Sequence, residues 1–227
     1  MIIFLALKKN KLRINKFVAL HFPTSRRKAD QLIAEGKVLV NNNIAQLGVE
    51  VNPSDKIYVD GKLLKHNIIH EYYLFNKPKG YICSHKKQGD GKTIFELVQK
   101  DYLKFGGRLD KDSEGLMILS TDGDWLNQIF SPKSKIEKKY IVKINKPLQS
   151  LSKFRKKITF KGERLSLSTI SRINDFTFEV SLNSGKNHEI RNIFYSNGFN
   201  VVGLKRVSIG NYQLKSISKG NLIKITI

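Results

Sequence analysis

The chain has 227 residues, of which 41 are Lys or Arg and 19 are Asp or Glu, giving a formal net charge of +22. So large an excess of positive charge repels itself unless a polyanion offsets it, which favours a nucleic acid partner over an anionic membrane surface. A lysine-rich composition without functional cause is the alternative, but it does not explain arginines placed inside motifs. The single cysteine, Cys83, excludes an internal disulfide and a zinc site built from several cysteines, and it favours a reducing, cytoplasmic setting.

The first ten residues, 1–10, are predicted to be a tail. The apolar run over 1–7 has no basic region before it. It is too short for a signal peptide or for a helix that spans a membrane. We therefore expect no targeting segment and no membrane contact.

Residues 11–66 are predicted to form a small α/β unit. Ser25 or Thr24 is placed to cap a helix, and Gly36 is placed to end it. The predicted elements, in chain order, are a helix around 12–22, a helix over 26–35, a strand at 37–40, a turn at 41–43, and strands at 57–59 and 63–64 joined by a tight turn at Asp60-Gly61.

Basic residues crowd the first turn of the second predicted helix, at Arg26, Arg27 and Lys28. Helix N-termini favour anions, so cations at this place are locally unfavourable unless phosphate lies between them. A solvated, exposed turn is the alternative. With Arg13 and Lys16 on the preceding helix, these residues are the candidate RNA contacts of the unit.

Four segments of this unit resemble the alpha-L RNA-binding fold found in ribosomal small-subunit protein four. They are LRINKF at 12–17, SRRKADQLI at 25–33, GKVLVN at 36–41 and VNPSD at 51–55. The resemblance implies binding of structured RNA through shape and phosphate, with little reading of bases. Since 12 basic and 5 acidic residues lie up to residue 66, and 29 and 14 beyond it, the second part is expected to touch RNA as well.

After a predicted linker at 67–71, residues 72–227 mix short strands and helices without regular strand-helix-strand spacing. This mixture favours an α+β fold over a doubly wound sheet. Residues 86–91 are predicted to form a mobile basic loop. The predicted strands and helices are strands at 72–75, 116–119, 140–144 and 176–182, and helices at 93–98, 124–130 and 188–195, the last closed by Gly198.

Three polar clusters interrupt these elements, at 76–80 (NKPKG), 107–123 (GRLDKDSEGLMILSTDG) and 184–191 (SGKNHEIR). In the second cluster, Asp110 lies in a loop that begins with glycine, directly before an apolar run typical of a buried strand. Such a loop places an acid at the end of a buried strand, where it is both held rigidly and accessible to a ligand. A simple turn-forming role for Asp110 is the alternative.

In this order the clusters resemble the RsuA-type rRNA pseudouridine synthases, the branch that includes RsuA, RluB and RluF. That family carries an Asn-Lys-Pro-x-Gly turn, a Gly-Arg-Leu-Asp loop followed by Gly-Leu, and a helix start Gly-x-x-x-x-[Ile/Val]-[Arg/Lys]. The resemblance covers 11–227, and residues 205–210 match a late strand of the family. It implies a catalytic domain over 72–227 with a central mixed, largely antiparallel sheet flanked by helices, and no metal or other cofactor.

The resemblance also implies roles for individual residues. Asp110 would be the carboxylate that starts breakage of the uridine glycosidic bond, Arg191 its buried ion-pair partner, and Tyr140 the residue that meets the target base. An ordinary strand position for Tyr140 and a surface position for Arg191 are the alternatives. The further candidate contacts with substrate or RNA are Lys77, which would also order the site, Arg108, Lys186 and His188, the last as an RNA contact or a helix cap.

The sequence therefore predicts a monomeric, cytoplasmic enzyme that isomerises a specific uridine of rRNA. The sequence of residues 111–115 (KDSEG) favours large-subunit over small-subunit rRNA as the substrate. A non-catalytic RNA-binding or ribosome-assembly factor on the same fold is the alternative.

Overall fold

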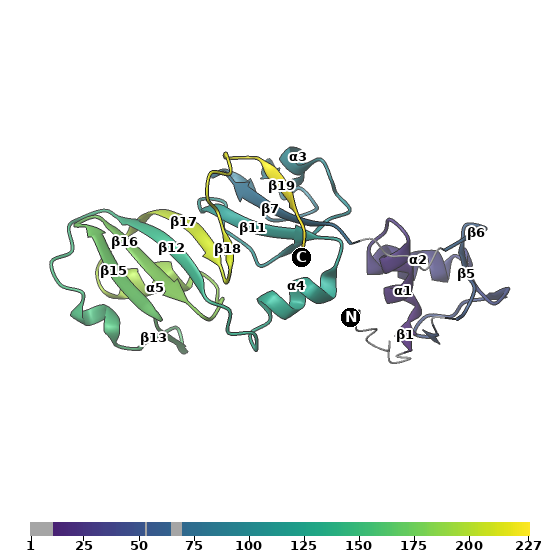
Figure 1. Ribbon diagram of the computed structural model, residues 1–227. Coiled ribbons are helices and arrows are strands. Elements are labelled where there is room, and N and C mark those ends of the chain that lie inside the picture. Colours follow the sequence, from purple (N-terminus) through teal and green to yellow (C-terminus); the bar gives the residue numbers. More distant parts are fainter. Residues whose placement is uncertain (1–10, 53, 65–69) are drawn as a thin grey trace, which may run out of the picture. The chain divides into compact units, whose positions relative to one another are not determined.

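The computed structural model describes residues 11–52, 54–64 and 70–227 (Figure 1). The chain divides into two compact units, Met1–His70 and Glu71–Ile227. This division falls within the predicted linker at 67–71, of which 67–69 lie outside the described residues, as does the predicted tail at 1–10.

The N-terminal unit packs two helices against a small sheet with strand order β3-β2-β5-β6. Its elements are β1 (Leu12–Arg13), α1 (Ile14–His21), α2 (Arg26–Ala34), β2 (Val38–Val40), β3 (Asn43–Ile44), β4 (Glu50–Val51), β5 (Ile57–Val59) and β6 (Lys62–Leu63). The core contains Phe17 from α1, Leu32 from α2 and Val38 from β2. Apolar residues at helical spacing in both helices thus meet the inner side of the sheet.

The predicted cap, helix end and hairpin turn of this unit are all observed. Of the two candidate caps it is Ser25 that caps α2, because its hydroxyl accepts a hydrogen bond from the Lys28 amide at 3.2 Å. Gly36 follows the helix with φ of +71°, and Asp60 and Gly61 both have positive φ in the turn between β5 and β6. Such positive angles are what a tight hairpin between twisted strands requires.

The C-terminal unit is built on one nine-stranded sheet, whose main path runs β15-β16-β12-β17-β11-β7-β19. Among the described strands of this sheet only β11 and β17 pair in parallel. The elements are β7 (Tyr72–Lys77), β8 (Tyr81–Ile82), β9 (Lys92–Thr93), α3 (Phe95–Val98), β10 (Lys104–Gly106), β11 (Glu114–Ser120), α4 (Gly123–Phe130), β12 (Lys138–Ile144), the 3-10 turn η1 (Ser152–Arg155), β13 (Ile158–Phe160), β14 (Glu163–Leu165), β15 (Thr169–Asn174), β16 (Thr177–Leu182), α5 (Glu189–Ser196), β17 (Val201–Ile209), β18 (Tyr212–Gln213) and β19 (Leu222–Ile225).

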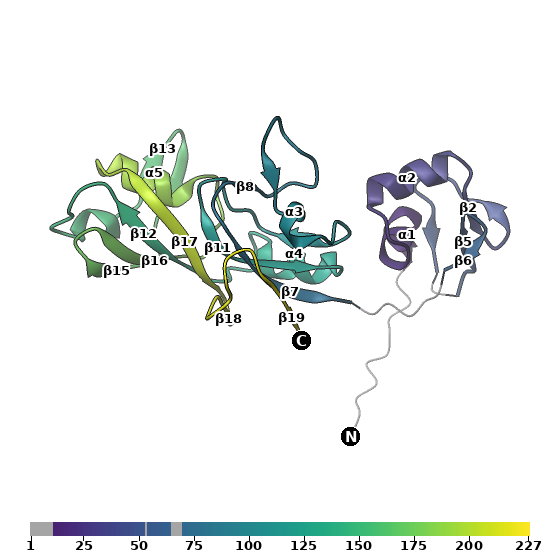
Figure 2. The same cartoon turned by 90° about the horizontal axis from the view of Figure 1, so that it is seen from above.

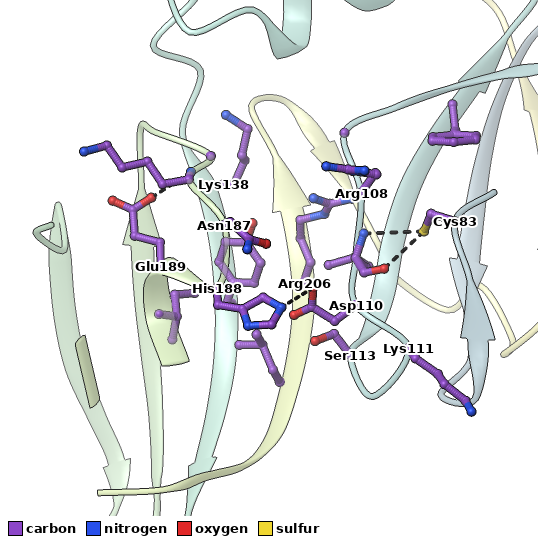
Figure 3. A pocket seen from close by; sticks show the side chains of 18 of the residues that line it. Cys83, Arg108, Asp110, Lys111, Ser113, Lys138, Asn187, His188, Glu189 and Arg206 are labelled. Carbon is purple, nitrogen blue, oxygen red and sulfur yellow. Dashed lines mark hydrogen bonds and ion pairs between the residues drawn. The ribbon is translucent and has the colours of Figure 1, made fainter. Parts of the chain in front are cut away.

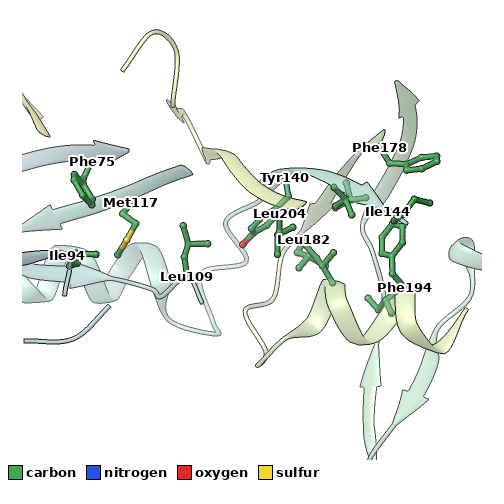
Figure 4. Packing of buried hydrophobic residues seen from close by; sticks show 14 of the residues in the cluster. Phe75, Ile94, Leu109, Met117, Tyr140, Ile144, Phe178, Leu182, Phe194 and Leu204 are labelled. Atoms are coloured by element: carbon green, nitrogen blue, oxygen red, sulfur yellow. The ribbon is translucent and has the colours of Figure 1, made fainter. Parts of the chain in front are cut away.

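Both faces of this sheet are buried around β11. Met117 and Leu119 belong to a large apolar cluster with residues of α3 and α5, whereas Leu116 and Ile118 belong to a second cluster with residues of α4. Alternate residues of a strand point to opposite faces, so a continuous apolar strand needs cover on both. Figure 4 shows the large cluster, which includes Leu109 beside the Asp110 loop.

The predicted α+β class and the mixed, largely antiparallel sheet are confirmed, but several elements differ from the prediction, and β10, β13, β14, β18 and β19 were not predicted. The predicted helix at 93–98 begins only at Phe95, because Lys92–Thr93 pair with Tyr81–Ile82 as β9 and β8. Strand β15 was not predicted either, since nearly every residue of it is exposed, and its pairing with β16 fixes it instead. Figure 2 shows α5 and β13 on the same side of the strands.

None of the helices in the described part of the chain combines the length and the apolar character that a membrane crossing requires.

Candidate active site

The second and third polar clusters of the C-terminal unit line one pocket of about 680 Å³ (Figure 3). This volume lies within the range of pockets that accept a small organic group, roughly 300–1,000 Å³. Asp110 from the second cluster and His188 from the third both line it. Tyr140 from β12 lines it as well.

The loop that carries Asp110 connects β10 to β11, and a buried ammonium group fixes it from below. Lys77 has 0% exposure, and its Nζ donates to the carbonyl oxygens of Ser113 at 2.7 Å, Asp110 at 3.0 Å, Pro78 at 3.1 Å and Lys111 at 3.4 Å. Burial lowers the pKa of Lys77, and the nearby carboxylates, Asp110 among them, oppose this shift. Lys77 of the first cluster therefore holds the loop of the second cluster in place, and we call this set of hydrogen bonds the Lys77 clamp.

Close packing of glycines shapes the same loop. A Cβ atom at Gly106 would lie 2.2 Å from the Phe130 ring, and one at Gly115 would lie 2.2 Å from the Arg206 carbonyl oxygen. Gly115 also has φ of +110°, a conformation that other residues rarely adopt. The chain at both ends of the loop can approach α4 and β17 only because these side chains are missing.

Each carboxylate oxygen of Asp110 faces a basic side chain. Oδ1 lies 3.3 Å from His188 Nε2, and Oδ2 lies 3.7 Å from Arg191 Nε. The Asp110 side chain is 39% exposed and that of Arg191 25% exposed. The predicted pairing of the two is thus observed, but Arg191 is only partly buried.

Arg191 is oriented by two further contacts. Its Nη1 donates to the Val201 carbonyl oxygen at 2.9 Å, and its Nη2 donates to the Ser113 hydroxyl at 3.3 Å. Ser113 is itself fully buried and accepts from Lys77 through its carbonyl oxygen. Lys77, Ser113 and Arg191 therefore form a continuous support beneath the Asp110 carboxylate.

Tyr140 lies on β12 beside β17, where its Cα partner is Arg206. Its side chain is 8% exposed and contributes to the large apolar cluster as well as to the pocket wall. A ring in this position offers an apolar surface for stacking and a phenol oxygen for hydrogen bonding.

The third cluster begins α5. Glu189 is buried, and its carboxylate accepts hydrogen bonds from the Ser184 hydroxyl at 2.7 Å and from the Lys186 amide at 3.2 Å. His188 precedes the helix in a left-handed conformation with φ of +51°, which presents its imidazole to Asp110 (Figure 3). His188 occupies the N-cap position of α5, as predicted, but its side chain makes no capping hydrogen bond.

The candidate RNA contacts of the C-terminal unit differ in exposure. Lys77 is not an RNA contact, because its side chain has no exposed surface. Arg108 is exposed at the pocket. Lys186 also lines the pocket, and its Nζ donates to the Arg164 carbonyl oxygen at 2.7 Å, which ties it to the β13–β14 hairpin.

The candidate contacts of the N-terminal unit lie at the beginnings of its two helices. Arg13, Arg26, Arg27 and Lys28 are exposed, and Lys16 is half-buried. Arg26 Nη2 donates to the Asn15 side-chain oxygen at 3.2 Å, which links the first turns of α1 and α2. The structure therefore brings the two predicted groups of cations together.

Several residues of the pocket were not predicted. They are Cys83, Ser113, Lys138, Glu189 and Arg206. The position of Lys138 two residues before Tyr140 gave a usable signal, because alternate strand residues share a face. Arg206 gave no such signal, because Lys205 beside it in β17 is charged as well.

Cys83 has a packing role beside the Asp110 loop. Its thiol donates to the Leu109 carbonyl oxygen at 3.2 Å, and the Leu109 amide donates to its sulfur at 3.4 Å. Burial raises the pKa of the Cys83 thiol, which keeps it protonated.

Chemically, the pocket presents an oriented carboxylate beside a stacking surface. A carboxylate can stabilise or trap the oxocarbenium-like carbon that forms when a bond at the anomeric position of a sugar breaks. In the part of the chain that the structure describes, no group of three or more His, Cys, Asp and Glu side chains is arranged to bind a metal ion.

The sequence pattern of the family described as RNA pseudouridylate synthase matches residues 71–196, more than half of the chain. The chain belongs to this family. The pattern of the S4 domain matches residues 12–57, which cover most of the N-terminal unit. This synthase is therefore an isomerase that acts on RNA, and the alternative of a non-catalytic factor on the same fold is not supported.

Relatives of this synthase match over nearly the whole chain. Ribosomal small subunit pseudouridine synthase A of Pasteurella multocida is 32% identical over 213 residues, which cover 89% of this chain and 90% of that protein. Ribosomal large subunit pseudouridine synthase B of Bacillus subtilis is 30% identical over 226 residues, covering 94% and 92%. A solved structure described as a crystal structure of pseudouridylate synthase has a TM-score of 0.68 at 30% identity, covering 95% of this chain and 96% of that chain.

Proposed function

We propose that this synthase isomerises a specific uridine of ribosomal RNA and that Asp110 is the carboxylate that reacts. The observation that carries the proposal is the Asp110 side chain at the pocket edge, with His188 3.3 Å from one oxygen and Arg191 3.7 Å from the other. An acid fixed in this way stays oriented and still has 39% of its side chain open to a substrate.

The reaction itself explains why one carboxylate is enough. The bond from uracil N1 to the sugar C1′ breaks, uracil turns, and a new bond forms from C5 to C1′. A hydrolase needs a second carboxylate to activate water. Here water would intercept the sugar, so the site has to exclude it, and a partly enclosed pocket beside one acid suits this requirement.

Arg191 and Tyr140 take supporting roles in the proposal. Arg191 orients the Asp110 carboxylate through a charge-assisted contact. Tyr140 stacks on the target base, because its ring forms part of the pocket wall. The uridine has to turn out of its stem or loop to reach these residues.

Ribosomal RNA is proposed as the substrate from two supports. The S4 domain pattern and the exposed cations of α1 and α2 suit binding of structured RNA. The relatives from Pasteurella multocida and Bacillus subtilis carry names that specify the small and the large ribosomal subunit respectively. We retain large-subunit rRNA as the favoured target, from the sequence of 111–115, and a cytoplasmic monomer as the acting form.

The direct test is the variant Asp110→Asn, which keeps the size of the side chain and removes its charge. Pseudouridine formation should fall by at least about 1,000-fold, the scale of losing a reacting carboxylate. The dissociation constant for rRNA should change by less than about tenfold, or 1.4 kcal/mol. Asp112→Asn, on the same loop but exposed, is the matched control and should keep full activity. Undiminished turnover by Asp110→Asn would refute the proposal.

Mapping of pseudouridines in rRNA from cells that lack the gene would identify the target. One position of large-subunit rRNA should revert to uridine and be restored by the wild-type gene, but not by Asp110→Asn. Loss of a small-subunit position instead would contradict the favoured subunit, and an unchanged map of both subunits would contradict an rRNA substrate.

A further inference from the structure

Arg206 is a cation inside the pocket wall, and none of the described carboxylates forms an ion pair with it. Its side chain is 2% exposed, and its Nε donates to the Leu116 carbonyl oxygen at 2.7 Å. Its Nη2 is buried and has no hydrogen-bond acceptor within the described structure. A buried guanidinium without a carboxylate or a full set of acceptors is costly, so its presence needs a reason.

A second buried cation lies near it. Lys138 is 5% exposed and its Nζ donates to the carbonyl oxygens of Ile136 at 2.9 Å and Ser184 at 3.5 Å. Burial is the larger cause that lowers the pKa of Lys138, and the charge of Arg206 lowers it further, while Glu189 opposes the shift. Two like charges are therefore placed in one desolvated wall.

Strand geometry puts both cations beside Tyr140. Arg206 is the Cα partner of Tyr140 across β12 and β17, and Lys138 precedes Tyr140 by two residues. Alternate residues of a strand share a face, so all three contribute to the same wall of the pocket. Figure 3 shows Arg206 extending from β17 between Lys138 and the Asp110 loop.

The reaction produces an anion at this place for part of its course. When the bond between N1 and C1′ breaks, its electron pair leaves with uracil and spreads over N1, O2 and O4. The bond from C5 to C1′ then forms, the proton on C5 is lost, and N1 gains a proton, so the net charge is unchanged at the end. Between the two bonds, uracil carries negative charge and is not attached to the sugar.

We propose that Arg206, supported by Lys138, stabilises the negative charge on uracil while the base is detached from the sugar. The inference rests on the proposed function, because it assumes that the target base enters the pocket against Tyr140. Cations fixed in a desolvated wall stabilise a developing charge more strongly than the same cations in water, and they need no reorganisation during the reaction. Retention of the free base follows from the same attraction.

The first experiment compares Arg206→Gln with Arg206→Lys in single-turnover assays with saturating enzyme and a target rRNA fragment. The rate of pseudouridine formation should fall by about 100-fold in Arg206→Gln, as for removal of one charge-stabilising donor, while the dissociation constant for RNA stays within about threefold. Arg206→Lys should lose less. Lys205→Gln, which removes a charge from the next position of β17, is the control and should keep the wild-type rate.

A substrate with a better leaving group separates this role from a structural one. With 5-fluorouridine at the target position, the fluorine withdraws electrons and stabilises the uracil anion without help from the protein. Consumption of the fluorinated uridine should then be slowed less by Arg206→Gln than consumption of uridine. An equal deficit with both substrates would overturn the inference.

Lys138→Met extends the test if Arg206→Gln does not fold, as judged by the fluorescence of the single tryptophan, Trp125. It keeps an unbranched side chain, and it should show a smaller loss of rate with the same sensitivity to fluorine. A wild-type rate in the folded variants would overturn the inference, as would a loss confined to RNA affinity, which would indicate a phosphate site. Either result leaves the role of Asp110 intact, since that role is tested by Asp110→Asn alone.

Discussion

The two units of this synthase use positive charge in opposite ways. In the N-terminal unit the candidate cations Arg26, Arg27 and Lys28 lie exposed on the first turn of α2. In the C-terminal unit Lys77 and Arg206 are buried, and main-chain carbonyl oxygens accept from them. Exposed cations act on RNA over a distance and are screened by salt, whereas buried ones set local geometry and field. Net charge alone, which is +22, does not distinguish these uses.

Among substitutions of these buried and exposed cations, replacement of Lys77 is expected to have the largest effect on activity and stability. Lys77→Met should abolish most activity and lower the free energy of unfolding of the C-terminal unit by about 3 kcal/mol, because buried carbonyl oxygens lose their donor. Urea unfolding followed by Trp125 fluorescence measures the second quantity. Lys79→Met, two residues away and exposed, is the matched control. A stability within 0.5 kcal/mol of the wild type, roughly the scale of a surface change, would show that the clamp is unnecessary.

The exposed cations should give the converse result. In the combined variant Arg26→Gln, Arg27→Gln and Lys28→Gln, rRNA affinity should fall, and the slope of log K against log salt should flatten by about two. The unfolding free energy of the C-terminal unit and the rate at saturating RNA should not change. Binding titrations at several salt concentrations measure the slope, and an unaltered slope would remove α2 from the RNA-binding surface.

A smaller effect is expected at the helix cap that presents these cations. Ser25→Ala should destabilise α2 by about 1 kcal/mol, because the Lys28 amide loses its acceptor. Amide hydrogen exchange should quicken in α2 and stay constant in α4, which Asp122 caps in the other unit. Equal exchange in α2 of the variant and the wild type would contradict the capping role.

The smallest expected effect concerns Glu71 at the start of β7. Hydrogen bonding from Tyr102 is the main cause that lowers the pKa of Glu71, with Tyr73 and Lys224 contributing. Because the folded state has the lower pKa, this carboxylate stabilises the fold above its unfolded value of about 4.3, and that contribution disappears as the pH falls below it. Glu71→Gln should therefore reduce stability at pH 6 and approach the wild type near pH 3. A constant difference across this range would contradict the assignment.

The sequence was most informative where a residue type has a local reason. Ser25, Gly36 and the turn at Asp60-Gly61 were predicted because caps and tight turns depend on the residues that form them. The Asp110 loop and its following strand were predicted for the same reason. Strand β15 was missed, because an exposed edge strand is fixed by its pairing with the neighbouring strand β16.

What the sequence determined by itself was therefore the division of the chain, its family and the residues from which a site could be built. Only the tertiary structure decided how these residues act together. It placed Lys77 beneath the Asp110 loop rather than on RNA, the His188 imidazole against Asp110, and Arg206 beside Tyr140. These contacts join residues distant in sequence, and their energies come from burial and orientation, which no local pattern of residues encodes.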